Sequence, residues 1–102
     1  MKLFPTCVAC RIAYRPCKNG VVVLELAGSR PYKLWNADML ECPKCGNAII
    51  SGFGGSPILD YELGFDEAIR EAAEAENLYL EGERSTPAEL TIADILAQLG
   101  AP

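Results

Sequence analysis

Four of the five cysteines in this 102-residue chain are spaced as metal ligands. They form two Cys-X-X-Cys pairs, Cys7 with Cys10 and Cys42 with Cys45, and 31 residues lie between the pairs. A Cys-X-X-Cys turn, or knuckle, places two thiolates on one side of a tight backbone turn. Two knuckles brought together offer four sulfurs in a tetrahedron, which suits Zn²⁺ or a single iron ion. The spacing predicts one metal per chain held by Cys7, Cys10, Cys42 and Cys45, although the insert exceeds the usual 15–20 or so residues.

Two other interpretations of the pairs fit less well. A disulfide framework normally has an even number of cysteines and a secretory leader, whereas this chain has five cysteines and no leader pattern. A redox Cys-X-X-Cys follows a strand and opens a helix. Here Pro5 and Thr6 precede the first pair, and no helical pattern follows either one.

The fifth cysteine, Cys17, lies outside both pairs, beside Lys18 and an expected hairpin turn at Asn19-Gly20. It could be a replacement ligand, or a thiol made more reactive by Arg15 and Lys18. We predict a free thiol, because no base or partner cysteine accompanies it in the sequence.

The residue types present argue against catalysis. The chain contains no histidine, no Gly-rich nucleotide motif and no pattern that marks an acid–base pair. A metal with four cysteine ligands has no open position for a catalytic water. We therefore expect a structural site in a protein that is not an enzyme.

Short strands are predicted between and after the knuckles. The run Val21–Leu26 is β-branched, Tyr32–Trp35 alternates polar with apolar residues, and a second turn is expected at Ala27–Pro31. Further short strands are expected at residues 12–14, 39–41 and 48–50. Because such a module has a very small core, the metal should supply much of its folding free energy.

The second half differs in charge and composition. Residues 1–50 carry seven basic and three acidic side chains, whereas residues 51–102 carry two basic and eleven acidic ones. Gly52–Pro57 reads as a turn or short linker between the halves. Beyond it, apolar residues near helical spacing predict a helix that packs on the first half or presents an acidic face to a partner. These residues are Phe65, Ala68, Ile69, Ala72 and Tyr79.

A second helix is expected from Ile92 to Leu99. Thr91 is its predicted N-cap, Leu90 could pack on Ile95 as a hydrophobic staple, and Gly100 would end it. Its apolar stripe should dock on its own domain, or else insert into a groove of a partner. The stripe comprises Ile92, Ile95, Leu96 and Leu99.

Together these patterns predict an α+β chain. We expect a small four-cysteine zinc β-ribbon at residues 1–53, followed by an acidic segment of about two helices at residues 54–102, packed on the ribbon or facing a partner.

Residues 1–53 resemble two families. The paired Cys-X-X-Cys and the form Cys42-Pro43-Lys44-Cys45-Gly46 are similar to zinc-ribbon domains, which implies that fold and a zinc ion. With the stretch Pro31–Trp35 added, the chain resembles small uncharacterised zinc-ribbon proteins of bacteriophage and bacterial genomes. That resemblance implies an accessory or inhibitory phage protein.

The cysteine spacing, with Tyr14 and Pro16, also resembles rubredoxin, in which four thiolates hold a redox-active iron. This implies iron electron transfer as an alternative function. Three features depart from that family. Arg11 stands where a glycine normally follows the first knuckle, the insert is a valine-rich strand, and the module is basic.

We expect a cytoplasmic protein that recognises a macromolecule. The longest aliphatic run, Val21–Leu24, is too short for a membrane span. A protein partner is favoured because the whole chain carries a net charge of −5. Nucleic-acid binding stays open through the basic residues Arg11, Arg15, Lys18, Arg30 and Lys33, with aromatic side chains that stack on bases or instead fill the core.

Overall fold

The structure, a computed structural model, describes residues 3–58, 64–82 and 86–99. Within these ranges the fold is mixed α+β and mostly strand, with two helices, as the sequence predicts at this level. The elements are β1 (Thr6–Cys7), β2 (Ile12–Ala13), β3 (Arg15–Ala27), β4 (Arg30–Glu41), β5 (Ala48–Ser51), α1 (Phe65–Glu74), β6 (Leu78–Gly82) and α2 (Ile92–Gln98).

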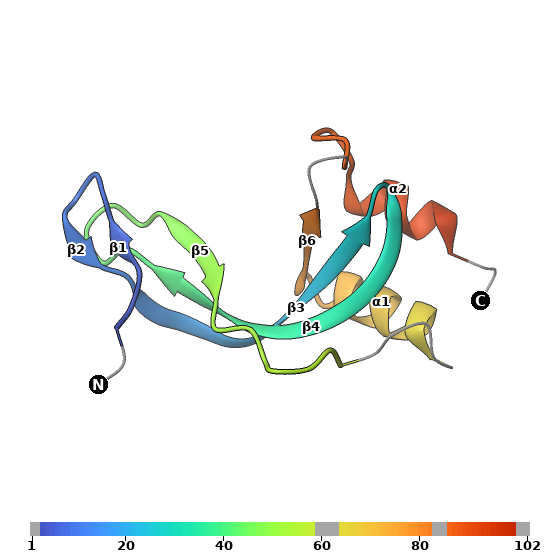
Figure 1. Cartoon of the computed structure of the whole chain (residues 1–102), viewed down its shortest axis with the longest axis horizontal. Coiled ribbons are helices and arrows are strands. Elements are labelled where there is room, and N and C mark those ends of the chain that lie inside the picture. Colours follow the sequence, from blue (N-terminus) through green and yellow to red (C-terminus); the bar gives the residue numbers. More distant parts are fainter. Residues whose placement is uncertain (1–2, 59–63, 83–85, 100–102) are drawn as a thin grey trace.

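The long hairpin of β3 and β4 connects the two ends of the molecule (Figure 1). Its strands pair antiparallel from Arg15 opposite Glu41 to Ala27 opposite Arg30. The predicted second turn is confirmed, and Gly28 begins it with a φ of 64°. The cysteine knuckles lie at the open end of this hairpin, and both helices lie toward its turn (Figure 1).

The predicted hairpin turn at Asn19-Gly20 is wrong, because both residues lie inside β3. The pairing with β4 shifts between Asn19 and Val21, so Gly20 is the extra residue of a bulge. A bulge and a tight turn both favour a residue with positive φ, and Gly20 has a φ of 76°. Gly20 has the positive φ that a turn would need, but the chain continues along β3 without reversing.

The sheet also contains a strand that the sequence analysis does not predict. Its order is β5-β4-β3-β6, and β6 runs parallel to β3, with Val22 opposite Leu78 and Leu26 opposite Gly82. Tyr79, assigned above to a helix, lies in β6. The predicted division at residue 53 stays a prediction, although β6 from the second half joins the sheet of the first.

Helix α1 ends before Tyr79 because the backbone reverses at Glu76, which has a φ of 53°. The amide of Glu76 donates to the carbonyl of Ala73, and that of Asn77 donates to the carbonyl of Ala72, at 3.1 and 2.9 Å. This hydrogen-bond pattern is a Schellman motif, which stops a helix and turns the chain away from its axis. Residues after Asn77 are thereby released to join the sheet.

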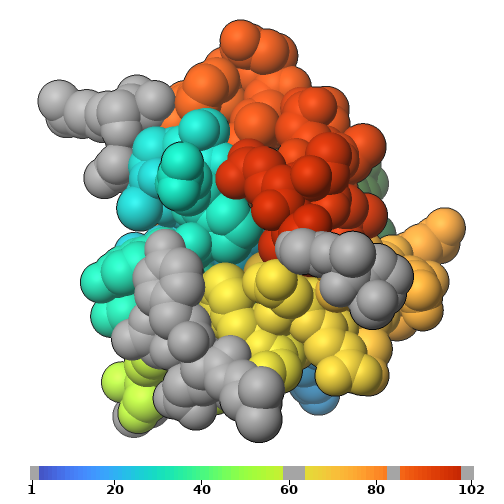
Figure 2. All heavy atoms as spheres, turned by 90° about the vertical axis from the view of Figure 1, so that its right-hand side faces the viewer, coloured from blue at the N-terminus to red at the C-terminus, as the bar shows by residue number. Residues whose placement is uncertain are grey.

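Both helices cover one face of the sheet near the hairpin turn (Figure 2). The buried core there joins residues of three strands and both helices: Leu24, Leu26, Leu34, Phe65, Ile69, Ala72, Leu78 and Ile95. A smaller buried cluster, Cys7, Tyr14, Leu40 and Cys42, lies at the other end. Neither helix in the described part of the chain is long and apolar enough to cross a bilayer.

The start of α2 agrees with its prediction. The hydroxyl of Thr91 accepts from the amide of Asp94 at 3.2 Å, and the Asp94 carboxylate accepts from the amide of Thr91 at 2.9 Å. This is a capping box. Leu90 packs against the core cluster that contains Ile95.

Candidate metal centre

Two short pieces of sheet position the two knuckles. The first knuckle connects β1 to β2, where Cys7 pairs with Ile12. The second connects β4 to β5, where Glu41 pairs with Ala48. Each cysteine pair therefore sits in a turn whose ends are held by strand pairing, and the long β3–β4 hairpin brings the two turns to the same place.

The sulfurs of Cys7, Cys10, Cys42 and Cys45 all lie within 4.8 Å of one another. The Sγ atoms of Cys7 and Cys45 are 3.8 Å apart, far beyond a disulfide bond length. A tetrahedron with Zn–S bonds of about 2.3 Å has sulfur–sulfur edges of about 3.8 Å. The four predicted ligands thus come together, and their spacing fits one tetrahedral ion.

The two knuckles have the same backbone geometry. The amide of Arg11 donates to the carbonyl of Cys7 at 2.7 Å, and the amide of Gly46 donates to the carbonyl of Cys42 at 2.9 Å. Arg11 and Gly46 both have positive φ, 60° and 79°. Arg11 therefore takes the left-handed conformation that glycine normally provides at this position.

Part of the surroundings was not identified from the sequence. The side-chain amide of Asn47 donates to the Tyr14 hydroxyl at 2.8 Å, and the backbone carbonyl of Asn47 accepts from the backbone amide of Cys42. The first contact ties the second knuckle to Tyr14, between β2 and β3, and the second closes the turn of the second knuckle itself. The asparagine directly after Cys-Pro-Lys-Cys-Gly is visible in the sequence. That its partner is Tyr14 is not, because the two residues are 33 positions apart in the chain.

Burial is unequal among the four cysteines. Cys7 and Cys42 are buried, Cys10 is half-buried and Cys45 is exposed. Cys7 and Cys42 pack with Tyr14 and Leu40. The site is therefore closed on the side of the sheet and reaches solvent at Cys45.

The thiols of the cluster have divergent acidities. The pKa of Cys42 falls to about 6, chiefly because the amide of Cys45 donates to its sulfur at 3.5 Å. The pKa of Cys10 rises to about 12, first through its hydrogen bond with Cys45 and then through burial. Four thiols so close together cannot all ionise unless a cation balances their charge. A metal ion would supply that charge, and the cysteines would release their protons when it binds.

Cys17 lies apart from this group. It is exposed, forms no disulfide, and its sulfur lies 3.5 Å from the carbonyl oxygen of Met39. It is the extra residue of a second irregularity in β3, between Pro16 and Lys18. The expectation of a free thiol agrees with this position.

The five predicted nucleic-acid contacts fall into two groups. Arg11, Arg15 and Lys18 lie at the cysteine end, and Arg30 and Lys33 lie by the hairpin turn. Lys18 and Ala27, the partner of Arg30, are near opposite ends of β3, which at about 3.3 Å per residue places them about 30 Å apart. The structure does not gather them into one patch, and their role stays a prediction.

The predicted partner-facing residues of α2 contact the protein's own core. Ile95 is completely buried, and Ile92, Leu96 and Leu99 are half-buried against the same cluster. The apolar face of α2 thus docks on its own domain, as one of the two predicted arrangements has it. Insertion into a partner groove stays untested.

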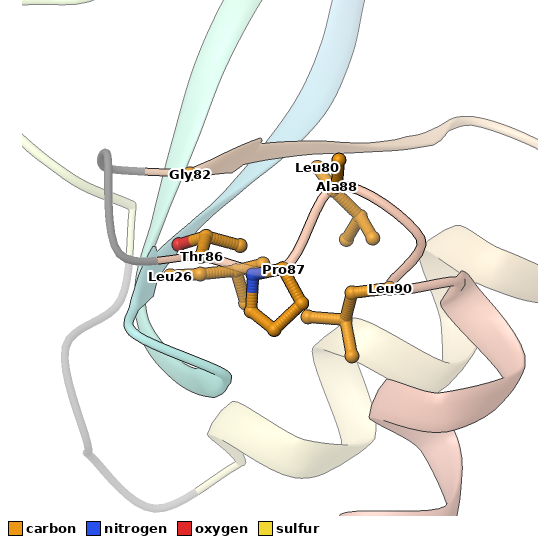
Figure 3. Close-up of a pocket in the computed structure, with 7 residues that line it drawn as sticks. All are labelled: Leu26, Leu80, Gly82, Thr86, Pro87, Ala88 and Leu90. Carbon is orange, nitrogen blue, oxygen red and sulfur yellow. The ribbon is translucent and has the colours of Figure 1, made fainter.

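A separate hollow of about 260 Å³ opens between β6 and the segment before α2 (Figure 3). It is lined by Leu26, Leu80, Gly82, Thr86, Pro87, Ala88 and Leu90. The Thr86 hydroxyl donates to the carbonyl of Gly28 at 2.7 Å, and none of the lining side chains is ionisable. This lining has no ionisable group for acid–base chemistry, and its one hydroxyl is engaged with the Gly28 carbonyl.

Comparisons of the chain with protein-family models, with curated proteins and with solved structures find no match.

Proposed function

We propose that this protein is a non-enzymatic zinc-ribbon protein in which one structural Zn²⁺ stabilises a module that binds another macromolecule, a protein rather than a nucleic acid. The observation that carries the proposal is the set of four cysteine sulfurs within 4.8 Å of one another at the end of a long hairpin.

The donor set supports a structural role. Four thiolates fill the coordination sphere of Zn²⁺, so no position is left for a water or substrate. The chain has no histidine that could act as a general base or replace a ligand. When bound, the ion would neutralise part of the thiolate charge and join β1, β2 and the β4–β5 turn.

The charge distribution supports a protein partner. The two basic groups lie at opposite ends of the hairpin, so these five side chains do not offer a nucleic acid one continuous basic surface. The helical half is strongly acidic by sequence and would repel phosphates. An accessory or inhibitory role in a phage is the form of this function that the family resemblance implies.

Iron electron transfer is the second candidate. One observation keeps it in play: the positive φ of Arg11 gives the first knuckle the backbone shape of a glycine-containing one, which removes one of the departures from rubredoxin. The same four thiolates suit a single iron ion.

Metal analysis tests the proposal. We expect protein purified without added metal to be colourless and to contain one zinc per chain. Cys42→Ser should lose the metal, because it removes a buried ligand, whereas Cys17→Ser should keep it in full. Stoichiometric iron with strong thiolate-to-iron absorption, and a reversible one-electron couple after anaerobic reconstitution, would replace the zinc proposal with the electron-carrier one.

The partner class has its own test. Binding to single-stranded or duplex probes should be absent at low salt if the partner is a protein. Binding that weakens steeply as salt rises would instead support the nucleic-acid alternative.

A further inference from the structure

One edge of the sheet is open at the helical end. β6 is the last strand of the sheet, and in the described part of the chain no strand pairs with its outer side. The opposite edge is covered beyond β5, where two backbone amides of residues 54–58 donate to carbonyls of β4 at 2.9 and 2.6 Å. An uncovered edge offers its backbone hydrogen-bonding groups to a further strand.

The pairing with β3 decides which backbone groups of β6 face outward. The amide of Val22 donates to the carbonyl of Asn77 at 3.0 Å, and Val22 lies opposite Leu78. In a parallel pair, alternate residues of a strand bond the neighbouring strand, and the residues between them face the other way. The N–H and C=O groups of Leu78, Leu80 and Gly82 therefore point away from β3. Within the residues that the structure describes, no backbone hydrogen bond reaches these outward groups.

The hollow described above lies beside this edge (Figure 3). Leu80 lines it, and so does Leu26, which belongs to the core on the helix side of the sheet. Side chains directly opposite each other on paired strands share a face. A residue of an added strand opposite Leu80 would therefore point its side chain toward the hollow, whose volume is about 260 Å³. The hollow suits an apolar side chain at that position.

The surroundings of the edge are acidic. Residues 76–90 carry four glutamates and one arginine, and Glu81 is exposed on β6. On the hairpin, Glu25 adds one negative charge, and Lys33 and Arg30 on β4 add two positive ones. Two negative charges remain in excess, and α1, which packs on β6, has four acidic residues and one basic one. This balance favours a basic partner at the edge.

We propose that an extended segment of a partner protein adds to β6 as a further, antiparallel strand. Its backbone would pair with the outward groups of β6, an apolar side chain would enter the hollow beside Leu80, and a neighbouring basic side chain would lie beside Glu81. The antiparallel direction follows because such pairs are slightly more stable per residue than parallel ones. A second copy of this chain would instead bring two acidic edges together. The inference rests on the proposed function, in which the partner is a protein.

A synthetic peptide tests the site on metal-loaded protein. The probe Lys-Thr-Lys-Leu-Lys-Thr-Lys carries its basic side chains on one side of a strand and its leucine on the other. Because β6 has only five residues, we expect a Kd of about 10–100 µM. The same peptide with its leucine replaced by serine should bind about tenfold more weakly or worse. No binding of the probe at about 1 mM overturns the proposal.

Methylation of the peptide backbone separates strand addition from simple charge attraction. In an antiparallel pair, the peptide residue opposite Leu80 exchanges both of its hydrogen bonds with Leu80 when the groups of Leu80 face it. A probe with N-methyl groups on the leucine and both threonines keeps every charge but lacks these donors, so it should not bind. Equal binding of the methylated and unmethylated probes would contradict the proposal.

Hydrogen exchange locates the bound peptide on the sheet. In the free protein the amides of Leu78 and Leu80 should exchange quickly, whereas those of Tyr79 and Glu81 should be protected by their bonds to β3. A saturating concentration of the probe should slow the exchange at Leu78 and Leu80 by about tenfold or more. Binding that leaves both of these amides unchanged would place the peptide elsewhere and overturn the assignment to β6.

A charge reversal tests the contact without altering the core. Glu81→Lys should weaken binding of the probe about tenfold, and a probe with glutamate in place of lysine should bind this variant better than wild type. Glu71→Lys, at an exposed position on α1, is the matched control and should bind the original probe nearly as wild type does. An equal loss in both variants would indicate a general charge effect and contradict a contact at β6.

Failure of this inference can be told apart from failure of the proposed function. Steeply salt-dependent binding of nucleic-acid probes by the wild-type chain would overturn the protein partner itself. A chain that binds neither nucleic acid nor the peptide would overturn only the strand addition at β6.

Discussion

Arg11 and Gly46 occupy equivalent positions in the two knuckles but differ in what the left-handed backbone costs them. A residue with a Cβ loses about 1–2 kcal/mol in this conformation, and glycine loses about 0.5–1 kcal/mol more chain entropy on folding. We therefore expect Arg11→Gly to stabilise the metal-loaded protein by about 0.5–1 kcal/mol in urea unfolding.

Gly46→Ala is the reciprocal change and should destabilise by about 1 kcal/mol or more. A Cβ at Gly46 would meet only a Glu41 carboxylate oxygen at 3.7 Å, an ordinary contact, so the expected loss is due to the backbone conformation. If both variants lose stability equally, the Arg11 side chain has a stabilising contact that outweighs its backbone cost.

At the scale of the element, the capping box gives α2 a defined start. The helix has only seven residues, too short to be stable without its cap and its packing. Thr91→Ala removes the acceptor for the amide of Asp94 and should lower the free energy of unfolding by about 1 kcal/mol. Thr91→Ser keeps the hydroxyl and should be nearly neutral in the same chemical denaturation.

The same box makes α2 sensitive to acid. The amide and the side chain of Thr91 hydrogen-bond to Asp94 and lower its pKa below the ordinary value of 3.8. A carboxylate with a lowered folded-state pKa stabilises the protein above its ordinary pKa, and this contribution is lost as the pH falls through the lowered one. The difference in stability between wild type and Asp94→Asn should therefore be present at pH 7 and shrink below about pH 4. A difference that does not change with pH would mean that the Asp94 charge adds nothing to the cap.

At the scale of the whole molecule, the two ends depend on different forces. The helical end is held by an apolar core that includes no cysteine, whereas the cluster at the other end includes Cys7 and Cys42. Chelation of the metal should expose the amides of β1, β2 and β5 to hydrogen exchange. Protection should persist in α1, β6 and the adjoining part of β3.

Ile69→Ala is the counterpart at the helical end. Ile69 is completely buried, so its truncation should cost about 2–5 kcal/mol and reduce protection in both helices. Loss of protection throughout the chain on chelation would show instead that the metal supports the whole fold.

Local features of the sequence determined much of this protein. The Cys-X-X-Cys pairs predicted all four members of the sulfur cluster, because a knuckle needs only four consecutive residues. The Thr91 cap and the start of the helix predicted at Ile92–Leu99 followed from signals within one turn. The helix ends one residue earlier, at Gln98, and the predicted stop at Gly100 lies outside the described residues. The Val21–Leu26 part of β3, the Tyr32–Trp35 part of β4 and the turn at Gly28 could also be predicted from local pattern.

The tertiary structure decided what depends on distant partners. Asn19-Gly20 favours positive φ in a turn or a bulge alike, and only the pairing of β3 with β4 made it a bulge. The segment Leu78–Gly82 is too short for its sequence pattern to predict a strand. It forms one because α1 ends before Glu76 and the segment can pair with the edge of β3. The cluster of Val21, Val23 and Ala37, with Ile50 and Tyr79 packed against it, likewise draws on four strands, since register determines which side chains share one side of a sheet.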